Sequence, residues 1–214
     1  MTPSPMVRVV DDDESFRTAV SRFLRASGYS VRAYGSAAEF LADSTWQLPG
    51  CILLDLEMPE LDGLAVQEAL KTAQCPLPIV FLSGRGDIPR SVMAMRRGAE
   101  DFLTKECAHE SLLEAIQRAV VRDAADRKMS ARLAELRSKL ARLSEREQEV
   151  LREVVRGKLN KQIAADLGIH ERTVKLHRTN LTTKLRIQSV AELTRLVQEA
   201  GWTGPGPVAF PKGQ

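Results

Sequence analysis

Four short apolar runs, each ending in a polar residue, constrain the fold of this chain more than any other feature. Runs such as CILLD and PIVFLS are too short for surface helices and are continuously apolar up to a final polar residue, as in parallel strands buried on both faces. Segments with helical patterns separate them, which predicts an α/β fold with a doubly wound, five-stranded parallel sheet. The carboxyl ends of such strands line one crevice. The polar residues expected to meet there are Asp11, Asp12, Asp55, Ser83 and Lys105.

This crevice has the composition of a site for Mg²⁺ and a phosphoryl group. Crowded carboxylates raise one another's pKa, and a hard cation with oxygen ligands relieves that conflict. We expect Asp55 to be the nucleophile that accepts the phosphoryl group, while Ser83 and Lys105 contact its oxygens. The alternative is structural: three aspartates that cap loops, a serine at a strand end and a surface lysine.

Length and charge indicate two domains with different partners. The 214 residues contain no apolar stretch of membrane-spanning length, and the N-terminal MTPSPMVR has no signal-peptide pattern, so we expect a cytoplasmic protein without a membrane partner. Up to Asp123 there are 13 basic against 18 acidic side chains, whereas the remainder has 18 against 10. An acidic half suits a metal and a basic half suits a polyanion, although a basic face can also be merely solvated.

Residues 108–143 connect the two halves and contain neither proline nor glycine, which predicts one long helix or two abutting ones. Apolar residues in this segment are spaced like a short heptad seam, at Met129, Leu133, Leu136, Leu140 and Leu143. Two interpretations remain open: the seam joins two copies of the chain, or it packs on the chain's own second domain.

The second half has the pattern of a helix-turn-helix. Ser144 and Glu147 form a capping box for a helix to about Arg156. We expect Asn160 to cap a second helix, Gly168 to make the turn, and a third, basic helix to span 171–185. Such a helix fits the major groove, where its side chains meet base edges and phosphates.

Residues 7–122 resemble the receiver domain of two-component response regulators in the motifs VVDDDES, LLDLEMPELDG, FLSGRGD and DFLTKE. The resemblance implies phosphotransfer from a sensor histidine kinase to Asp55. It also implies that Mg²⁺ is held by Asp12, Asp55 and the main-chain carbonyl of Glu57, with Asp11 acting through water. Ser83 and Phe102 would be the switch residues. Receivers usually have proline after the lysine, but Glu106 follows Lys105 here, so we expect a trans peptide and a shifted loop.

Residues 143–200 resemble the LuxR-type output domain, a four-helix unit that reads DNA with its third helix and pairs through its fourth, here 189–199. The resemblance implies base contacts from Lys175, Leu176 and Thr179, and phosphate contacts from Asn160, Arg172, Thr173 and Lys184. Lys161, His177 and Arg178 complete the expected DNA-binding set, although a lone histidine can equally serve packing. His170 stands where the family usually has a serine cap, so this helix start should be weaker.

The combination is similar to the FixJ/NarL class of bacterial transcription regulators. We therefore expect a receiver over 1–122, a helical linker over 123–142, the output domain over 143–200 and a disordered tail over 201–214. Phosphorylation would favour a homodimer through the segments 87–97 and 101–104, bound to promoter DNA, with RNA polymerase as a further candidate partner. Its only catalysis would be transfer to, and hydrolysis of, its own aspartyl phosphate.

Two rival functions remain open. One is a DNA-binding regulator controlled by oligomerisation or a protein partner without phosphate, which the missing proline makes worth testing. The other is a Mg²⁺-dependent phosphohydrolase of the haloacid-dehalogenase type, but Asp55 to Glu57 lacks the second aspartate of that motif.

Overall fold

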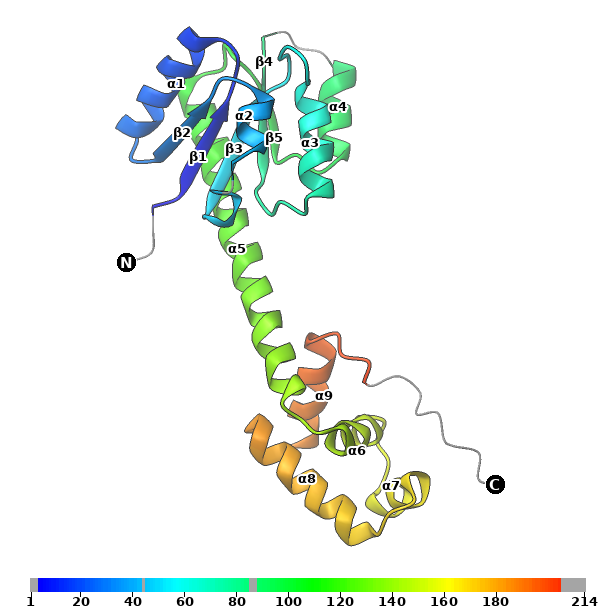
Figure 1. The fold of residues 1–214 in the computed structure, drawn as a ribbon. Helices are drawn as coiled ribbons and strands as arrows, with labels where there is room; N and C mark the ends of the chain where they lie inside the picture. Colours follow the sequence, from blue (N-terminus) through cyan, green and yellow to red (C-terminus); the bar gives the residue numbers. More distant parts are fainter. Residues whose placement is uncertain (1–3, 44, 85–87, 205–214) are drawn as a thin grey trace. The chain divides into compact units, whose positions relative to one another are not determined.

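The computed structural model describes residues 4–43, 45–84 and 88–204, and the chain divides into two compact units, Met1–Lys128 and Met129–Gln214. The first unit alternates strands and helices (Figure 1). In chain order the elements are β1 (Met6–Val10), α1 (Glu14–Ala26), β2 (Ser30–Tyr34), α2 (Ala37–Leu41), the 3₁₀ turn η1 (Thr45–Gln47), β3 (Gly50–Asp55), α3 (Gly63–Thr72), β4 (Ile79–Ser83), α4 (Ile88–Arg96), β5 (Asp101–Thr104) and α5 (His109–Ala141).

The five strands form one parallel sheet in the order β2-β1-β3-β4-β5, so the predicted fold of the first half is confirmed. The register aligns the strand ends: Val10 is paired with Leu54, Asp55 with Leu82, and Ser83 with Thr104. All carboxyl ends therefore lie at one edge of the sheet, as expected for parallel strands joined by helical crossovers.

Helices cover both faces of the sheet and form two cores. One core joins β-strand side chains to α2, α3 and α4, with Phe40, Leu70 and Ala94 among its buried members. The other joins the opposite face to α1 and α5 through residues such as Leu24 and Ile116. Because β3 and β4 are buried along their whole length, their continuous apolar runs are explained.

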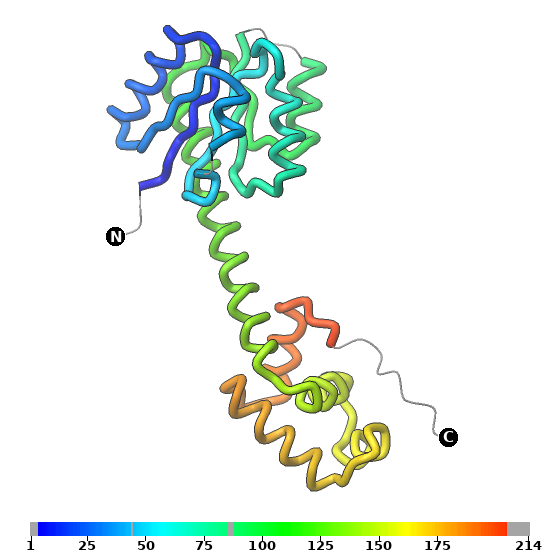
Figure 2. Tube along the Cα trace, in the orientation of Figure 1, coloured from blue at the N-terminus to red at the C-terminus, as the bar shows by residue number. Residues whose placement is uncertain are grey.

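Helix α5 is a single uninterrupted helix of 33 residues that continues from the first unit into the second (Figure 2). Two side chains of α5 fix the helix to the first unit, and they are paired with each other: the Nε of Arg127 donates to both carboxylate oxygens of Asp123 at 2.8 Å. Asp123 also accepts from the amide of Gly50 at 2.9 Å. The guanidinium then reaches the η1 segment and donates to the carbonyls of Gln47 (2.7 Å) and Leu48 (3.2 Å).

Up to residue 204, the second unit contains the end of α5 and four further helices, which agrees with the predicted four-helix domain. They are α6 (Glu145–Val155), α7 (Asn160–Leu167), α8 (Glu171–Leu185) and α9 (Val190–Glu199). The predicted capping box is present, since the amide of Glu147 donates to Ser144 Oγ and the amide of Ser144 donates to Glu147 Oε2.

The C-terminal part of the heptad seam packs on the chain's own second unit. Leu136, Leu140 and Leu143 are buried in the core formed with α6, α7, α8 and α9, whereas Met129 is 58% exposed. This settles the two interpretations in favour of intramolecular packing for these three leucines.

The structure extends beyond the predicted end of the domain. Trp202 packs against the same core and its amide donates to the carbonyl of Val197 at 3.1 Å, so the expectation of disorder is wrong at this residue. Most of the predicted disordered tail, 205–214, lies outside the described residues. Within the part of the chain that is described, no helix combines the length and the apolar character that crossing a membrane requires.

Candidate functional site

The carboxyl edge of the sheet collects an acidic cluster. Asp11, Asp12 and Asp55 each offer a carboxylate oxygen, and these atoms lie within 4.8 Å of one another. Asp11 and Asp55 are buried while Asp12 is exposed. The sequence therefore predicted correctly that these three side chains come together, because each follows or ends a parallel strand.

Main-chain amides hold the two buried carboxylates in place. The amide of Asp13 donates to Asp11 Oδ1 at 2.9 Å, and the amide of Glu57 donates to Asp55 Oδ1 at 3.2 Å. One oxygen of each carboxylate is thus used to fix its orientation. The other oxygen, Oδ2, is left to face the interior of the site.

Lys105 bridges these two remaining oxygens. Its Nζ lies 2.8 Å from Asp11 Oδ2 and 2.9 Å from Asp55 Oδ2, and it also lies 4.8 Å from the centre of the Phe16 ring. The peptide between Lys105 and Glu106 is trans, as predicted, since the described residues include no cis peptide. The missing proline therefore does not prevent Lys105 from reaching the acidic cluster.

Burial and charge act in opposite directions on these groups. Burial raises the pKa of Asp11 and of Asp55, and the hydrogen bonds from Lys105 offset that rise only in part. Burial alone would lower the pKa of Lys105, but its two carboxylate partners outweigh this effect and leave that pKa above its ordinary value. Two buried carboxylates that share one ammonium form a site in which added positive charge is favourable.

The other predicted residues of this site lie around the cluster. Ser83 is fully buried at the end of β4, one residue beyond Leu82, which pairs with Asp55. Glu57 is exposed two residues after Asp55. Phe102 is partly buried in β5 with its ring centre 6.2 Å from that of Phe81, so it has the packing of a core residue at the edge of the sheet.

A close backbone approach explains the glycine in the segment LDG. A Cβ on Gly63 would lie 2.5 Å from the carbonyl oxygen of Asp55 and 3.0 Å from the Phe81 ring. The first turn of α3 can therefore pass directly beside the main chain of Asp55 only because this residue has no side chain.

Sequence reasoning missed Arg90 and its partners. Arg90 lies in α4 and forms an ion pair with Asp62 at 2.7 Å and a longer one with Glu57 at 3.9 Å. Asp62 is the N-cap of α3 and accepts from the amide of Ala65 at 2.8 Å. A capping signal was readable in Asp62 before Gly63, but nothing in the sequence marks Arg90 as its partner.

The second candidate site is the exposed face of α8. Lys175, Leu176 and Thr179 are exposed, and Arg172 lies on the same side of the helix. The opposite side is buried through Val174, Leu181 and Leu185. One face of α8 therefore packs on the domain core and the opposite face is exposed to a partner, as a helix that reads DNA requires.

The remaining members of the expected DNA-binding set are placed less uniformly. Lys161 is exposed, whereas Thr173 and His177 are partly buried. As predicted, His170 precedes α8 without a side-chain cap bond.

Two residues expected to contact phosphates have protein partners. Lys184 Nζ lies 2.7 Å from the buried Glu147, whose pKa is lowered because this ion pair and the Ser144 amide outweigh its burial. Asn160 does not cap α7, so this prediction was wrong: the N-cap is Leu159, and Asn160 Oδ1 accepts from Arg178 at 2.7 Å. Both contacts tie α8 to a neighbouring helix.

Comparisons with known proteins match both halves of the chain. Residues 7–117 match the family described as response regulator receiver domain, and residues 141–197 match the luxR family of bacterial regulatory proteins. Response regulator protein TodT of Pseudomonas putida is 42% identical over 193 residues, which cover 90% of this chain and 85% of TodT. Transcriptional regulatory protein FixJ of Azorhizobium caulinodans is 36% identical over 201 residues, covering 94% and 95% of the two chains.

Solved structures of relatives agree with these matches. The response regulator StyR is 40% identical, with a TM-score of 0.83, and the match covers 92% of this chain and all of that one. Full-length FixJ from B. japonicum is 34% identical, with a TM-score of 0.56 and coverage of 94% and 98%. The chain therefore belongs to the response regulators that join a receiver domain to a luxR-type DNA-binding domain.

Proposed function

We propose that this response regulator accepts a phosphoryl group on Asp55 from a sensor histidine kinase and then binds promoter DNA as a homodimer. The observation that carries the proposal is the arrangement of Asp55 itself. Its Oδ1 is fixed by the Glu57 amide, while its Oδ2 faces Lys105, so one oxygen is oriented and the other is available as a nucleophile.

In this reaction Oδ2 of Asp55 attacks the phosphorus, and the bond from phosphorus to the donor nitrogen breaks. Lys105 moves from Asp55 to the new phosphoryl oxygens while it stays paired with Asp11. The Ser83 hydroxyl donates to another of these oxygens. The acyl phosphate carries a charge of about −1.5 to −2 where the free Asp55 carboxylate carried −1, at a place where one ammonium already faces two carboxylates.

The residues present fit Mg²⁺. The oxygens of Asp11, Asp12 and Asp55 are the hard ligands that this ion prefers, and the buried carboxylates carry more negative charge than Lys105 offsets. Asp12, Asp55 and the carbonyl of Glu57 would hold the ion directly, with Asp11 acting through water. When bound, Mg²⁺ would supply positive charge against the transferred phosphoryl group.

The proposed dimer face lies on α4 and β5. Several large apolar side chains of α4 are exposed, including Ile88 at 73% and Val92 at 50%. Movement of Ser83 and Phe102 towards the phosphoryl group would shift β5 and α4, which would change how this face presents these side chains. Two copies joined there would bring two α8 helices to half-sites about one helical turn apart.

For DNA we propose that Lys175, Leu176 and Thr179 face bases while Arg172 and Thr173 face phosphates. The exposed positions of Arg172, Lys175, Leu176 and Thr179 on α8 support this assignment. Lys161, His177 and Arg178 would support the backbone contacts. Asn160 and Lys184 would contribute to phosphate binding only after exchanging their partners Arg178 and Glu147, so their effect should be smaller.

The test of the acceptor is phosphorylation of the full chain by a small phosphodonor in the presence of Mg²⁺. Wild type and the surface control Glu68→Gln should form an acid-stable, base-labile acyl phosphate, and Asp55→Asn should form none. Equal labelling of Asp55→Asn would refute the assignment.

Sizing with and without beryllofluoride, followed by DNA selection on the species formed, tests the dimer. Equal DNA affinity of both species would favour the phosphate-independent alternative.

A further inference from the structure

The acidic cluster has an aromatic neighbour to which the proposed reaction gives no role. Phe16 lies in the first turn of α1 and is partly buried, and Nζ of Lys105 lies over its ring, 4.8 Å from the ring centre. The face of an aromatic ring is negative, so it attracts an ammonium at this distance, and more strongly where water is excluded. The Lys105 side chain is only 19% exposed. The contact between these two side chains is therefore partly desolvated.

Phe16 is held in place from the same acidic segment. Its amide donates to Oδ1 of the N-cap residue Asp13 at 3.1 Å, and the amide of Asp13 donates to Asp11 Oδ1 at 2.9 Å. The other oxygen of Asp11 lies 2.8 Å from Nζ of Lys105. These contacts form a closed loop from Asp11 through the start of α1 and the ring of Phe16 to Lys105. Phe16 also packs against the core that joins the sheet to α1 and α5, which restricts movement of the ring.

Lys105 depends on side-chain contacts for the position of its ammonium. Its stem is flexible, and fixing the rotatable bonds costs conformational entropy. The amide of Lys105 donates to the carbonyl of Ser83 at 2.9 Å, which places the main chain but not Nζ. The next residue, Glu106, has no ring that would restrict the backbone as a proline does. The contacts with Asp11, Asp55 and Phe16 therefore fix where Nζ lies.

One of these contacts changes during the proposed reaction. Oδ2 of Asp55 becomes the bridging oxygen of the acyl phosphate, and Lys105 passes to the new phosphoryl oxygens. A ring attracts a cation within about 6 Å of its centre, so the ammonium can shift by about 1 Å and stay in contact with Phe16. The ring should therefore matter most while the ammonium exchanges one anionic partner for another. An aliphatic side chain would fill the space at this position but would not attract the ammonium.

We propose that Phe16 is a positioning residue for phosphorylation, whose ring face holds the Lys105 ammonium beside Asp55 while the phosphoryl group is transferred. This inference rests on the proposed function, since it assigns a role within the transfer to Asp55. The aromatic face at position 16, and not its bulk, then sets the rate. Leucine at this position should slow the transfer, and another ring should restore it.

The test compares the rates at which four full-length proteins are phosphorylated by acetyl phosphate and Mg²⁺. Phe16→Leu should be about three- to tenfold slower than wild type, as expected for the loss of a partly desolvated contact between a cation and a ring. Phe16→Tyr keeps a ring and should stay within about twofold of wild type. If Phe16→Leu does not fold, Phe16→Met takes its place, because methionine also lacks a ring.

The matched control is Phe23→Leu. Phe23 is also a partly buried phenylalanine of α1, and it lines the same cavity of about 130 Å³ as Phe16 and Lys105. Its ring, however, stacks on His109, with 4.4 Å between the ring centres. Phe23→Leu should therefore be phosphorylated within about twofold of the wild-type rate, because it leaves the ring beside Lys105 in place.

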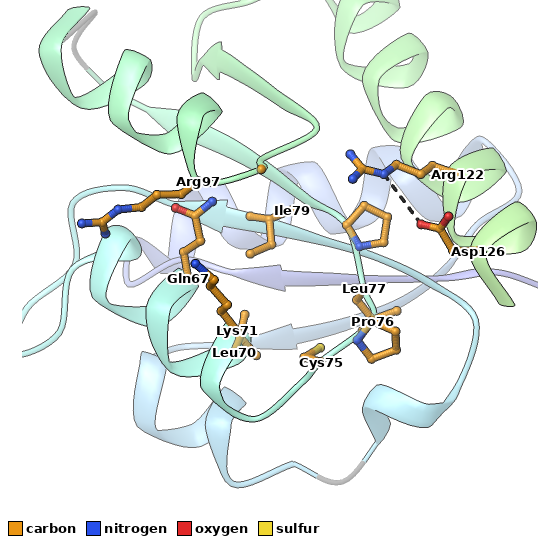
Figure 3. Close-up of a pocket in the computed structure, with 12 residues that line it drawn as sticks. Gln67, Leu70, Lys71, Cys75, Pro76, Leu77, Ile79, Arg97, Arg122 and Asp126 are labelled. Carbon is orange, nitrogen blue, oxygen red and sulfur yellow. Dashed lines mark ion pairs between the residues drawn. The ribbon is translucent and has the colours of Figure 1, made fainter. Parts of the chain in front are cut away.

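NMR of the unphosphorylated proteins separates the position of Lys105 from a general loss of structure. Protons held over a ring face are shifted upfield, so the ε-methylene protons of Lys105 should lie upfield in wild type and Phe16→Tyr and move downfield in Phe16→Leu. Lys71 is the reference. It lies on α3 beside the depression at the start of β4, whereas the acidic cluster lies beyond the end of that strand (Figure 3). The Lys71 shifts should be the same in all four proteins.

Three results would overturn the inference: Phe16→Leu as fast as wild type, Phe23→Leu slowed as much as Phe16→Leu, or Phe16→Tyr as slow as Phe16→Leu. Equal shifts of Lys105 in wild type and Phe16→Leu would also overturn it. A wild type that formed no acyl phosphate on Asp55 would refute the proposed function, and this inference with it. The rate of wild type thus distinguishes the two failures.

Discussion

The ion pair between Arg127 and Asp123 should stabilise the receiver more than any exposed ion pair on α5. Asp123 is 1% exposed and Arg127 is 26% exposed in their side chains, and Arg127 gives the carboxylate two hydrogen bonds of 2.8 Å. In the Arg127→Met variant the Asp123 carboxylate would stay buried. Of the donors that the structure shows for this carboxylate, the Gly50 amide would remain. Breaking a buried pair in this way costs about 3–5 kcal/mol.

The position of Arg127 places the expected loss at the low end of this range. A quarter of its side chain is exposed, so water can reach the vacated space and solvate Asp123 in part. Three main-chain carbonyls of the η1 region also lose a donor, but two of these three contacts are long, at 3.2 and 3.3 Å. We therefore expect Arg127→Met to lower the free energy of unfolding of the receiver by about 3 kcal/mol.

The measurement is denaturant unfolding followed by tryptophan fluorescence. Of the two tryptophans in the chain, Trp46 lies in η1 beside the ion pair and Trp202 packs on the second unit. A Trp202→Phe background therefore makes Trp46 the reporter of receiver unfolding. The control is Arg122→Ala, which breaks a half-exposed pair with Glu100 and should cost about 0–1 kcal/mol.

A double mutant distinguishes the cost of the unpaired buried carboxylate of Asp123 from the cost of lost packing. Asp123→Asn in the Arg127→Met background removes the uncompensated carboxylate and should recover at least half of the loss. If the double mutant is as unstable as Arg127→Met alone, the buried charge is not the cause. If Arg127→Met loses no more than Arg122→Ala, the argument from burial is wrong.

Three further perturbations have defined outcomes. Burial raises the pKa of Asp55 in the folded protein above the unfolded value of 3.8, so ionisation of this carboxyl opposes folding. Its contribution to stability is fully present below pH 3.8 and is lost as the pH rises through the pKa of the folded protein. Asp55→Asn should therefore raise the melting temperature of the metal-free protein, by an amount that grows from acidic to neutral pH. Mg²⁺ should raise the melting temperature of wild type but not of this variant. A gain in melting temperature at pH 3 equal to that at neutral pH would contradict the argument. Leu140→Ala should cost the second unit about 2–5 kcal/mol in denaturant unfolding, since Leu140 is 1% exposed, whereas Met129→Ala, at an exposed position, should stay within about 0.5 kcal/mol. In DNA-binding titrations, Arg172→Ala should reduce the salt slope by about one, while Leu176→Ala should relax base preference at an unchanged slope; the reverse pattern would exchange their roles.

The strand ends were predictable because parallel strands buried on both faces leave a simple pattern. Continuous apolar runs marked β3 and β4, and their last residues had to share an edge with Asp11. The same reasoning gave the acidic cluster and placed Lys105 at this edge, whereas Glu106 in place of proline had predicted a shifted loop. These predictions needed only local sequence and the geometry of a parallel sheet.

Contacts between distant segments were not predictable in this way. Arg8 interrupts the apolar run of β1 and is nevertheless fully buried, where it donates to the carbonyls of Thr45 and Leu48. Its burial depends on the path of η1, about which the run VRVV contains no information. The pair Arg90 and Asp62 is similar, since its members lie 28 residues apart on two helices.

Some local sequence patterns were compatible with more than one structure. Asn160 is a good N-cap by residue type, yet its side-chain oxygen accepts a hydrogen bond from Arg178 of α8. The N-cap of α7 is instead Leu159, which has no side-chain cap bond. The leucine seam fitted both a partner chain and the chain's own core, and only the positions of the other helices decide between them.

Helix α5 contributes to two separate interiors, and this limits how the chain can be divided. Leu136 and Leu140 precede the capping box at Ser144, yet they fill the centre of the DNA-binding unit. A fusion that supplied a foreign input module and rejoined this chain at residue 143 would leave a hole where these leucines belong. Exchange of modules between such regulators should therefore succeed only when the crossover falls further upstream in α5, close to Met129.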